Sequence, residues 1–184
     1  MTALLNRRLF SVAAIGGLAA CATAAPPVAA LLAEGLKPLS PLLGRWRGRG
    51  EGDPGVSTVE RTYAVALGGK FIEARNRSTY AAQPANPGGE THDDLGYYGF
   101  DRARRRVLFR QFHVEGFVLQ YLATAAASLD GPFVMEAEAI ENVPAGFRAR
   151  ETLTLTDDRL EEVFEVAESG KAFAVYSRNV LTRA

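Results

Sequence analysis

Two short segments combine imidazole with carboxylate, the pairing that metal binding and acid–base chemistry use. They are His92-Asp93-Asp94 and His113-Val114-Glu115. Alternate residues of a strand share a face, so His113 and Glu115 could contact one ion, but two ligands do not complete a site. Polar residues near turns usually bond to their neighbours instead. The sequence therefore predicts no metal site at either segment.

Glu151 and Glu162 are the other candidates for chemistry, because the alternation of the hairpin around Asp157-Asp158 places both on its apolar face. Such carboxylates either form an acid and base pair or satisfy internal arginines and water. The nucleophile motif G-x-S-x-G does not occur. The segment 50–55 fits the dinucleotide pattern G-x-G-x-x-G, but Pro54 interrupts it and no helix follows. We therefore assign no catalytic residues and expect a binding protein rather than an enzyme.

The elements that would position these residues are strands. From Trp46 onward, apolar and polar residues alternate between turn signals, and no helical period of useful length intervenes. The breaks lie at 52–55, 68–69, 84–89, 101–104, 115–116, 130–131, 143–146, 157–158 and 169–170. They predict an all-β fold, an antiparallel up-and-down barrel of about ten strands, preceded by a short apolar helix or turn at 36–43.

The register of the hairpin 107–123 decides which side chains enter the lumen. A two-residue turn at Glu115-Gly116 would point Arg110 and Tyr121 inward, whereas a turn one residue different would bring in Phe109, Gln111 and His113. We favour the first register because its inward face is more apolar. Arg110 opposite Tyr121 would then hold the carboxylate of a fatty-acid-like ligand. The predicted polar lumen residues are Arg110, Tyr121, Glu151 and Tyr176, with His113 as the alternative.

The first residues read as an export signal. Arg7-Arg8 precedes a short apolar stretch, and Leu18-Ala19-Ala20-Cys21 resembles a bacterial lipoprotein box, in which the cysteine is acylated. We therefore expect a signal peptide at 1–20, a tether and short helix at 21–41, and a barrel domain at 42–184. The protein would be lipid-anchored through Cys21 on the periplasmic side of the envelope, or free there if cleavage follows Ala24. Arg7-Arg8-Leu9-Phe10 also resembles a twin-arginine signal, so the export route stays open.

Charge argues against a nucleic-acid partner. The chain has 21 basic and 21 acidic residues, and without Arg7 and Arg8 the balance is 19 against 21. A nucleic-acid binder should carry an excess of basic residues on one face. The expected partners are a small ligand and, through the lipid, a membrane.

Gly44-Arg45-Trp46 at the first strand and Arg178 in the last segment resemble the calycin group, which comprises lipocalins, fatty-acid-binding proteins and nitrobindin-like barrels. The resemblance covers 42–183. It implies that Trp46 packs at the closed end of the barrel with Arg178 over it, a cation–π contact of about 0.5 to 2 kcal/mol.

The opening segment 42–50 is most similar to nitrobindin-like barrels, which bind haem through a histidine in a late strand. The corresponding segment 173–183 contains no histidine, and Tyr176 is its only residue of a type that ligates iron. We therefore expect no cofactor and an exported barrel that binds a small apolar or amphipathic molecule. The alternatives are a haem-binding barrel with redox or isomerase chemistry, and a structural envelope module with a filled lumen.

Overall fold

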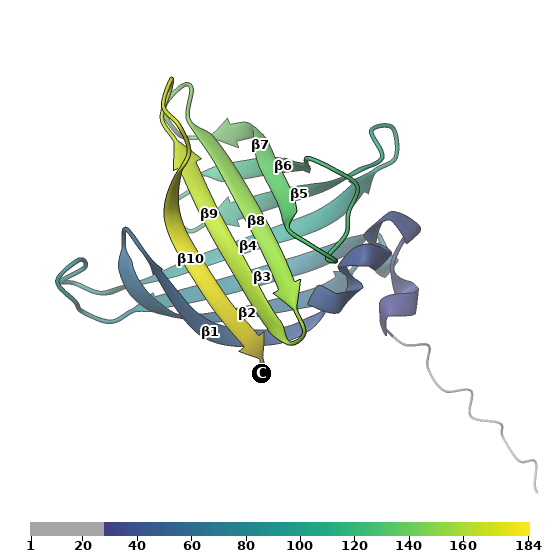
Figure 1. Ribbon diagram of the computed structural model, residues 1–184, viewed down its shortest axis with the longest axis horizontal. Coiled ribbons are helices and arrows are strands. Elements are labelled where there is room, and N and C mark those ends of the chain that lie inside the picture. Colours follow the sequence, from purple (N-terminus) through teal and green to yellow (C-terminus); the bar gives the residue numbers. More distant parts are fainter. Residues whose placement is uncertain (1–27) are drawn as a thin grey trace, which may run out of the picture.

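The structure, a computed structural model, describes residues 28–184. Ten antiparallel strands close into one barrel, in which each strand pairs with its sequence neighbours and β1 pairs with β10 (Figure 1). The strands are β1 (Gly44–Gly52), β2 (Gly55–Ala66), β3 (Phe71–Tyr80), β4 (Glu90–Asp101), β5 (Arg106–His113), β6 (Val118–Ala123), β7 (Phe133–Glu141), β8 (Arg148–Thr156), β9 (Arg159–Ala167) and β10 (Ala174–Arg183). The predicted fold class is confirmed, and every predicted break coincides with a connection between strands.

Short 3₁₀ helices precede the barrel and cover one of its ends. They are η1 (Val28–Leu31) and η2 (Glu34–Leu42), and a third, η3 (Leu67–Gly69), lies between β2 and β3. Leu36, Leu39 and Leu42 of η2 are completely buried. Pro38 and Pro41 lie inside η2, where the missing backbone N–H groups disfavour a regular α-helix. The predicted short apolar helix is thus present as a plug against the barrel.

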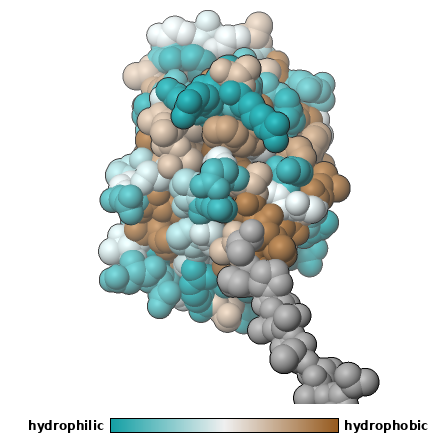
Figure 2. Space-filling view, turned by 90° about the vertical axis from the view of Figure 1, so that its right-hand side faces the viewer, coloured by the Kyte–Doolittle hydropathy of each residue, from teal (hydrophilic) through white to brown (hydrophobic). Residues whose placement is uncertain are grey.

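Hydrophilic and hydrophobic side chains are mixed on the helix-bearing side of the molecule, and hydrophobic ones gather beside the start of the described chain (Figure 2). Val28 and Leu31 belong to this segment and are 58% and 51% exposed. No helix among residues 28–184 is long and apolar enough to cross a membrane. The predicted signal peptide and Cys21 lie outside the described residues.

The barrel closes where the start of β1 meets the end of β10. Trp46 is buried there and donates from Nε1 to the carbonyl oxygen of Leu42 at 2.7 Å. The guanidinium of Arg183 lies 4.4 Å from the centre of the indole, and Nη1 donates to the carbonyl oxygen of Leu43 at 2.9 Å. Gly48 permits the close approach of the strands, because a Cβ at this position would lie 1.9 Å from the carbonyl oxygen of Val180.

The prediction that Arg178 lies over Trp46 was wrong. Arg178 lies opposite Glu51, five residues before Arg183, and forms an ion pair with Glu161. Antiparallel pairing brings the start of one strand to the end of the other, so the residue opposite Trp46 is Arg183. The expected contact between indole and guanidinium is present with a different arginine.

The favoured register of β5 was also wrong. Phe109 and Gln111 are buried and His113 faces the lumen, while Phe112 and Val114 are 47% and 63% exposed. The connection to β6 spans four residues rather than two and is closed by a hydrogen bond from the His113 N–H to the carbonyl oxygen of Phe117, 3.1 Å long. The inward face of β5 therefore follows the alternative register.

Candidate ligand-binding site

The barrel encloses a cavity of about 350 Å³. It reaches the end opposite Trp46, where Pro54, Glu115 and Val143 line it from the connections β1–β2, β5–β6 and β7–β8. Its apolar wall consists of Phe117, Leu119, Ile140, Val143, Phe147, Phe164 and Val166. Cavities of roughly 300 to 1,000 Å³ with such walls are typical of small-molecule sites.

A buried ion pair lies deep in this cavity. The guanidinium of Arg61 from β2 forms an ion pair with Glu162 from β9, and both side chains are less than a tenth exposed. Arg61 also donates to Oδ1 of Asn76, from Nη2 at 3.0 Å and from Nε at 3.2 Å. Asn179 of β10 donates to Glu162 Oε2 at 3.2 Å. The guanidinium is therefore already engaged, as a buried charge requires.

Sequence reasoning missed Arg61. It lies between Val59 and Tyr63 at alternate positions of β2, and both neighbours are buried. The parity of the strand was the signal that could have found it, since residues two apart share a face.

Glu151 on β8 faces the same cavity and is only 2% exposed. Burial raises the pKa of this carboxyl well above its usual range, and the charge of Glu162 adds to the effect. Burial therefore favours the neutral form of Glu151, which can donate a hydrogen bond. Glu151 and Glu162 both point inward, as predicted.

The remaining predicted lumen residues occupy three different environments. Tyr121 is buried in the packed part of the interior, 5.9 Å from the ring of Phe109, and its hydroxyl has no hydrogen-bond partner among the described residues. Tyr176 lines the mouth of the cavity from β10 and is 37% exposed. Arg110 lies on the outer surface, where Nε donates to Gln120 Oε1 at 2.7 Å. The predicted Arg110–Tyr121 clamp is therefore absent, because the register of β5 turns Arg110 outward.

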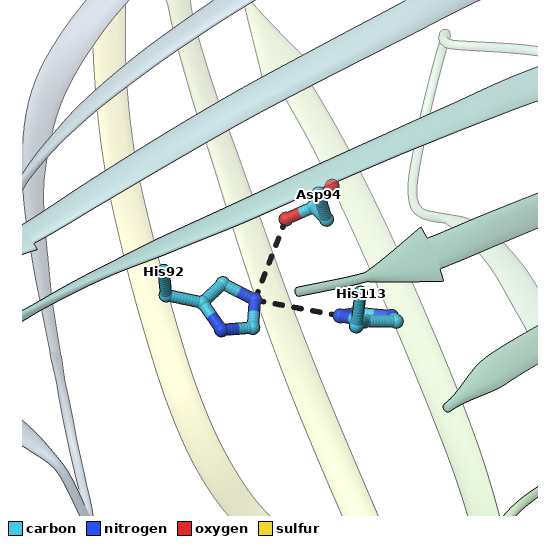
Figure 3. Close-up of side chains that lie close together, drawn as sticks. All are labelled: His92, Asp94 and His113. Carbon is cyan, nitrogen blue, oxygen red and sulfur yellow. Dashed lines mark hydrogen bonds and ion pairs between the residues drawn. The ribbon is translucent and has the colours of Figure 1, made fainter. Parts of the chain in front are cut away.

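Two histidines and a carboxylate meet on the wall formed by β4 and β5 (Figure 3). His92 and Asp94 are alternate residues of β4, and His113 of β5 lies directly opposite Asp94. His92 Nε2 is 3.6 Å from Asp94 Oδ2 and 3.4 Å from His113 Nδ1. The register of β4 and β5 thus joins two segments that appear separate in the sequence.

Hydrogen bonds from surrounding residues hold this cluster in place. His92 Nδ1 is 2.6 Å from Glu115 Oε1. Asn76 Nδ2 donates to Asp94 Oδ2 and Gln111 Nε2 to Asp94 Oδ1, both at 2.9 Å. The ring of His113 stacks on Phe117 at 4.0 Å, while its Nε2 is buried without a partner among the described residues.

The two imidazoles differ in charge. The neighbouring carboxylate of Asp94, helped by Glu115, raises the pKa of His92 to about 9. Burial lowers the pKa of His113 to about 4. Burial opposes ionisation of Asp94 as well, but His92 and Arg61 outweigh it and lower the pKa of Asp94 to about 2. At neutral pH the cluster therefore contains one imidazolium, one neutral imidazole and one carboxylate.

The family model described as "THAP4-like, heme-binding beta-barrel domain" matches residues 35–183. The chain belongs to this family. It is also similar to the crystal structure of Rv2717c from M. tuberculosis, with a TM-score of 0.66 and 23% sequence identity over 83% of this chain and 99% of that chain. That likeness shows a shared fold. No match was found among curated proteins.

Proposed function

We propose that the barrel binds one small amphipathic molecule in its lumen, and that haem is the ligand to test first. The cavity supports the proposal, because an apolar wall faces buried polar groups inside a closed barrel. Family membership favours haem as the ligand. The same cavity argues against a structural module whose lumen is filled by its own side chains.

The residues present fit haem, and His113 of β5 is the residue that would hold its iron. Haem iron in proteins is held by His, Cys, Met or Tyr. His113 lines the cavity as a neutral imidazole, and its Nε2 has no partner among the described residues. When bound, haem would supply a redox-active iron with a position for a diatomic ligand.

Tyr176 is a weaker iron ligand than His113. Partial burial and nearby carboxylates, including Asp53 and Glu90, raise the pKa of its phenol. A phenolate would therefore be disfavoured at the mouth of the cavity. No histidine occurs in β10, the strand in which nitrobindin-like barrels would place one.

Within residues 28–184, no unpaired arginine lines the cavity to hold a fatty-acid carboxylate. Arg110 is outside the barrel, and Arg61, the only arginine that lines the cavity among the described residues, is paired with Glu162. A ligand whose deep end is neutral or donates hydrogen bonds would match the buried groups better than an anion.

Haem titration of the purified barrel tests the proposal. We expect a Soret band with one haem per chain, which His113→Ala abolishes and Tyr176→Phe retains. Arg110→Ala serves as the matched control from the same strand and should bind as the wild type does. Absence of a Soret band in the wild type, or equal binding by His113→Ala, would overturn haem ligation by His113. Native mass spectrometry of protein from cells would then show whether another small molecule occupies the lumen.

Export and lipid anchoring remain part of the proposal, on the strength of Arg7-Arg8, the apolar stretch after it and Cys21. Expression of the full chain in a bacterium tests them. We expect the wild type in the membrane fraction and Cys21→Ala in the soluble periplasmic fraction. Equal distribution of the two proteins would refute acylation at Cys21.

A further inference from the structure

The three side chains on the β4–β5 wall have the spacing of ligands around one metal ion. In tetrahedral zinc sites with Zn–N bonds of about 2.0 to 2.1 Å, neighbouring ligand atoms lie about 3.4 Å apart. His92 Nε2 lies 3.4 Å from His113 Nδ1 and 3.6 Å from Asp94 Oδ2. All three ligand atoms lie within 4.8 Å of one another.

We propose that His92, Asp94 and His113 bind a divalent transition-metal ion of the Zn²⁺ type. Two imidazoles and one carboxylate are ligands that such ions prefer. The site is distinct from the proposed function, since it requires no haem and uses the other ring nitrogen of His113.

The groups behind the ligands are arranged as they are in metal sites. A ligating histidine usually donates its second ring N–H to a carboxylate or carbonyl, which fixes its orientation. His92 Nδ1 has such a partner in Glu115 at 2.6 Å. Asp94 accepts hydrogen bonds from Asn76 and Gln111, which hold the carboxylate in one orientation. These supports come from strands β3 and β5 and from the connection after β5, so the site is set in the barrel wall.

Three protein ligands leave one coordination position for a further group. His92, Asp94 and His113 all line the cavity, so that position is accessible from the lumen. Sites with three protein ligands and an open fourth position are typical of ions that contact water or substrate. A lumen ligand with an oxygen or nitrogen donor could therefore complete the coordination.

Cobalt titration of chelator-treated full-length protein tests the site, because tetrahedral Co²⁺ absorbs strongly in the visible range. We expect one Co²⁺ per chain, displaced by Zn²⁺. Asp94→Asn and His92→Gln should each weaken Co²⁺ binding more than about 100-fold, and Glu115→Gln by about 10- to 100-fold. The matched control is Asp93→Asn, which removes the neighbouring carboxylate that pairs with Arg77 on the outer surface.

Absence of the tetrahedral spectrum in the wild type would overturn the proposal, whatever the variants do. Equal loss of affinity in Asp93→Asn and Asp94→Asn would also overturn it, because it would indicate binding by surface charge. The haem and metal proposals fail separately, since Asp94→Asn should lose Co²⁺ but keep a haem Soret band. Circular dichroism of each variant confirms that the barrel is folded before its affinity is compared.

Discussion

Glu151 and Glu162 provide the most direct test of how charge is accommodated in the cavity. They are buried glutamates on neighbouring strands, and their surroundings differ. Glu162 forms an ion pair with Arg61, whereas Glu151 forms no ion pair with any described residue. Burial raises the pKa of Glu151 well above its usual range. Replacing each glutamate by glutamine should therefore have opposite effects on stability at neutral pH.

The direction in which pH changes the stability follows from proton binding by Glu151. The unfolded chain releases the proton of Glu151 at a pH of about 4.3, and the folded protein, in which this pKa is raised, releases it at higher pH, so stability falls as pH rises between the two pKa values. The slope is about 1.4 kcal/mol per pH unit for one proton. Glu151→Gln removes this term, so we expect the variant to gain up to about 2 kcal/mol over the wild type between pH 5.5 and pH 7.

Glu162→Gln is the matched control. It leaves the Arg61 guanidinium buried without its counter-ion, which costs about 3 to 5 kcal/mol. Urea unfolding at a series of pH values measures both effects, and the single, buried Trp46 is a suitable fluorescence probe. Parallel stability curves for the wild type and Glu151→Gln from pH 5 to pH 8 would show that Glu151 is ionised in the fold and refute the reasoning.

Four further substitutions test how the barrel closes. Arg183→Met should lower the free energy of unfolding by about 1 to 3 kcal/mol, because it removes the contact with Trp46 and hydrogen bonds to backbone carbonyls. Arg178→Met on the outer surface should cost less than about 1 kcal/mol, and equal losses in urea unfolding would contradict this assignment. Leu39→Ala should cost about 2 to 5 kcal/mol in the same assay, since its side chain is fully buried in the plug. Gly48→Ala should cost about 1 to 3 kcal/mol and speed amide exchange in β1 and β10, and unchanged exchange there would refute the close-approach argument.

The strands could be predicted because the alternation of apolar and polar residues and the turn residues agree. Asp157-Asp158, for example, connects β8 and β9 directly. This two-residue turn fixes the register, so Glu151 and Glu162 were placed correctly on the inner face. Where turn geometry determines the register, side-chain direction follows from sequence alone.

Side-chain direction on β5 could not be predicted from hydrophobicity, for a physical reason. The cavity wall there consists of Gln111 and His113, whereas the apolar Phe112 faces outward and is 47% exposed. A cavity wall made of polar side chains departs from the usual rule that the apolar face is buried. The residue types in the connection after His113 also do not indicate that this connection is four residues long rather than two. The misplacement of Arg110 and the omission of Arg61 share this cause, since both follow from expecting an apolar interior.

The position of His113 on β5 bears on both proposed ligands, haem and a divalent metal ion. In a closed barrel of ten strands, β5 and β10 are separated by four strands on either side, so both walls face one lumen. Placing the imidazole on β5 instead of β10 therefore leaves the fold and the Trp46 closure intact. It also sets His113 beside His92 and Asp94, where its Nδ1 faces a second imidazole while its Nε2 remains without a partner. Haem iron would use Nε2 and a divalent ion would use Nδ1, and because one neutral imidazole offers only one lone pair, the two occupants exclude each other. The dissociation constants of haem and Co²⁺, measured on the same protein preparation, would therefore show which of the two the lumen binds more tightly.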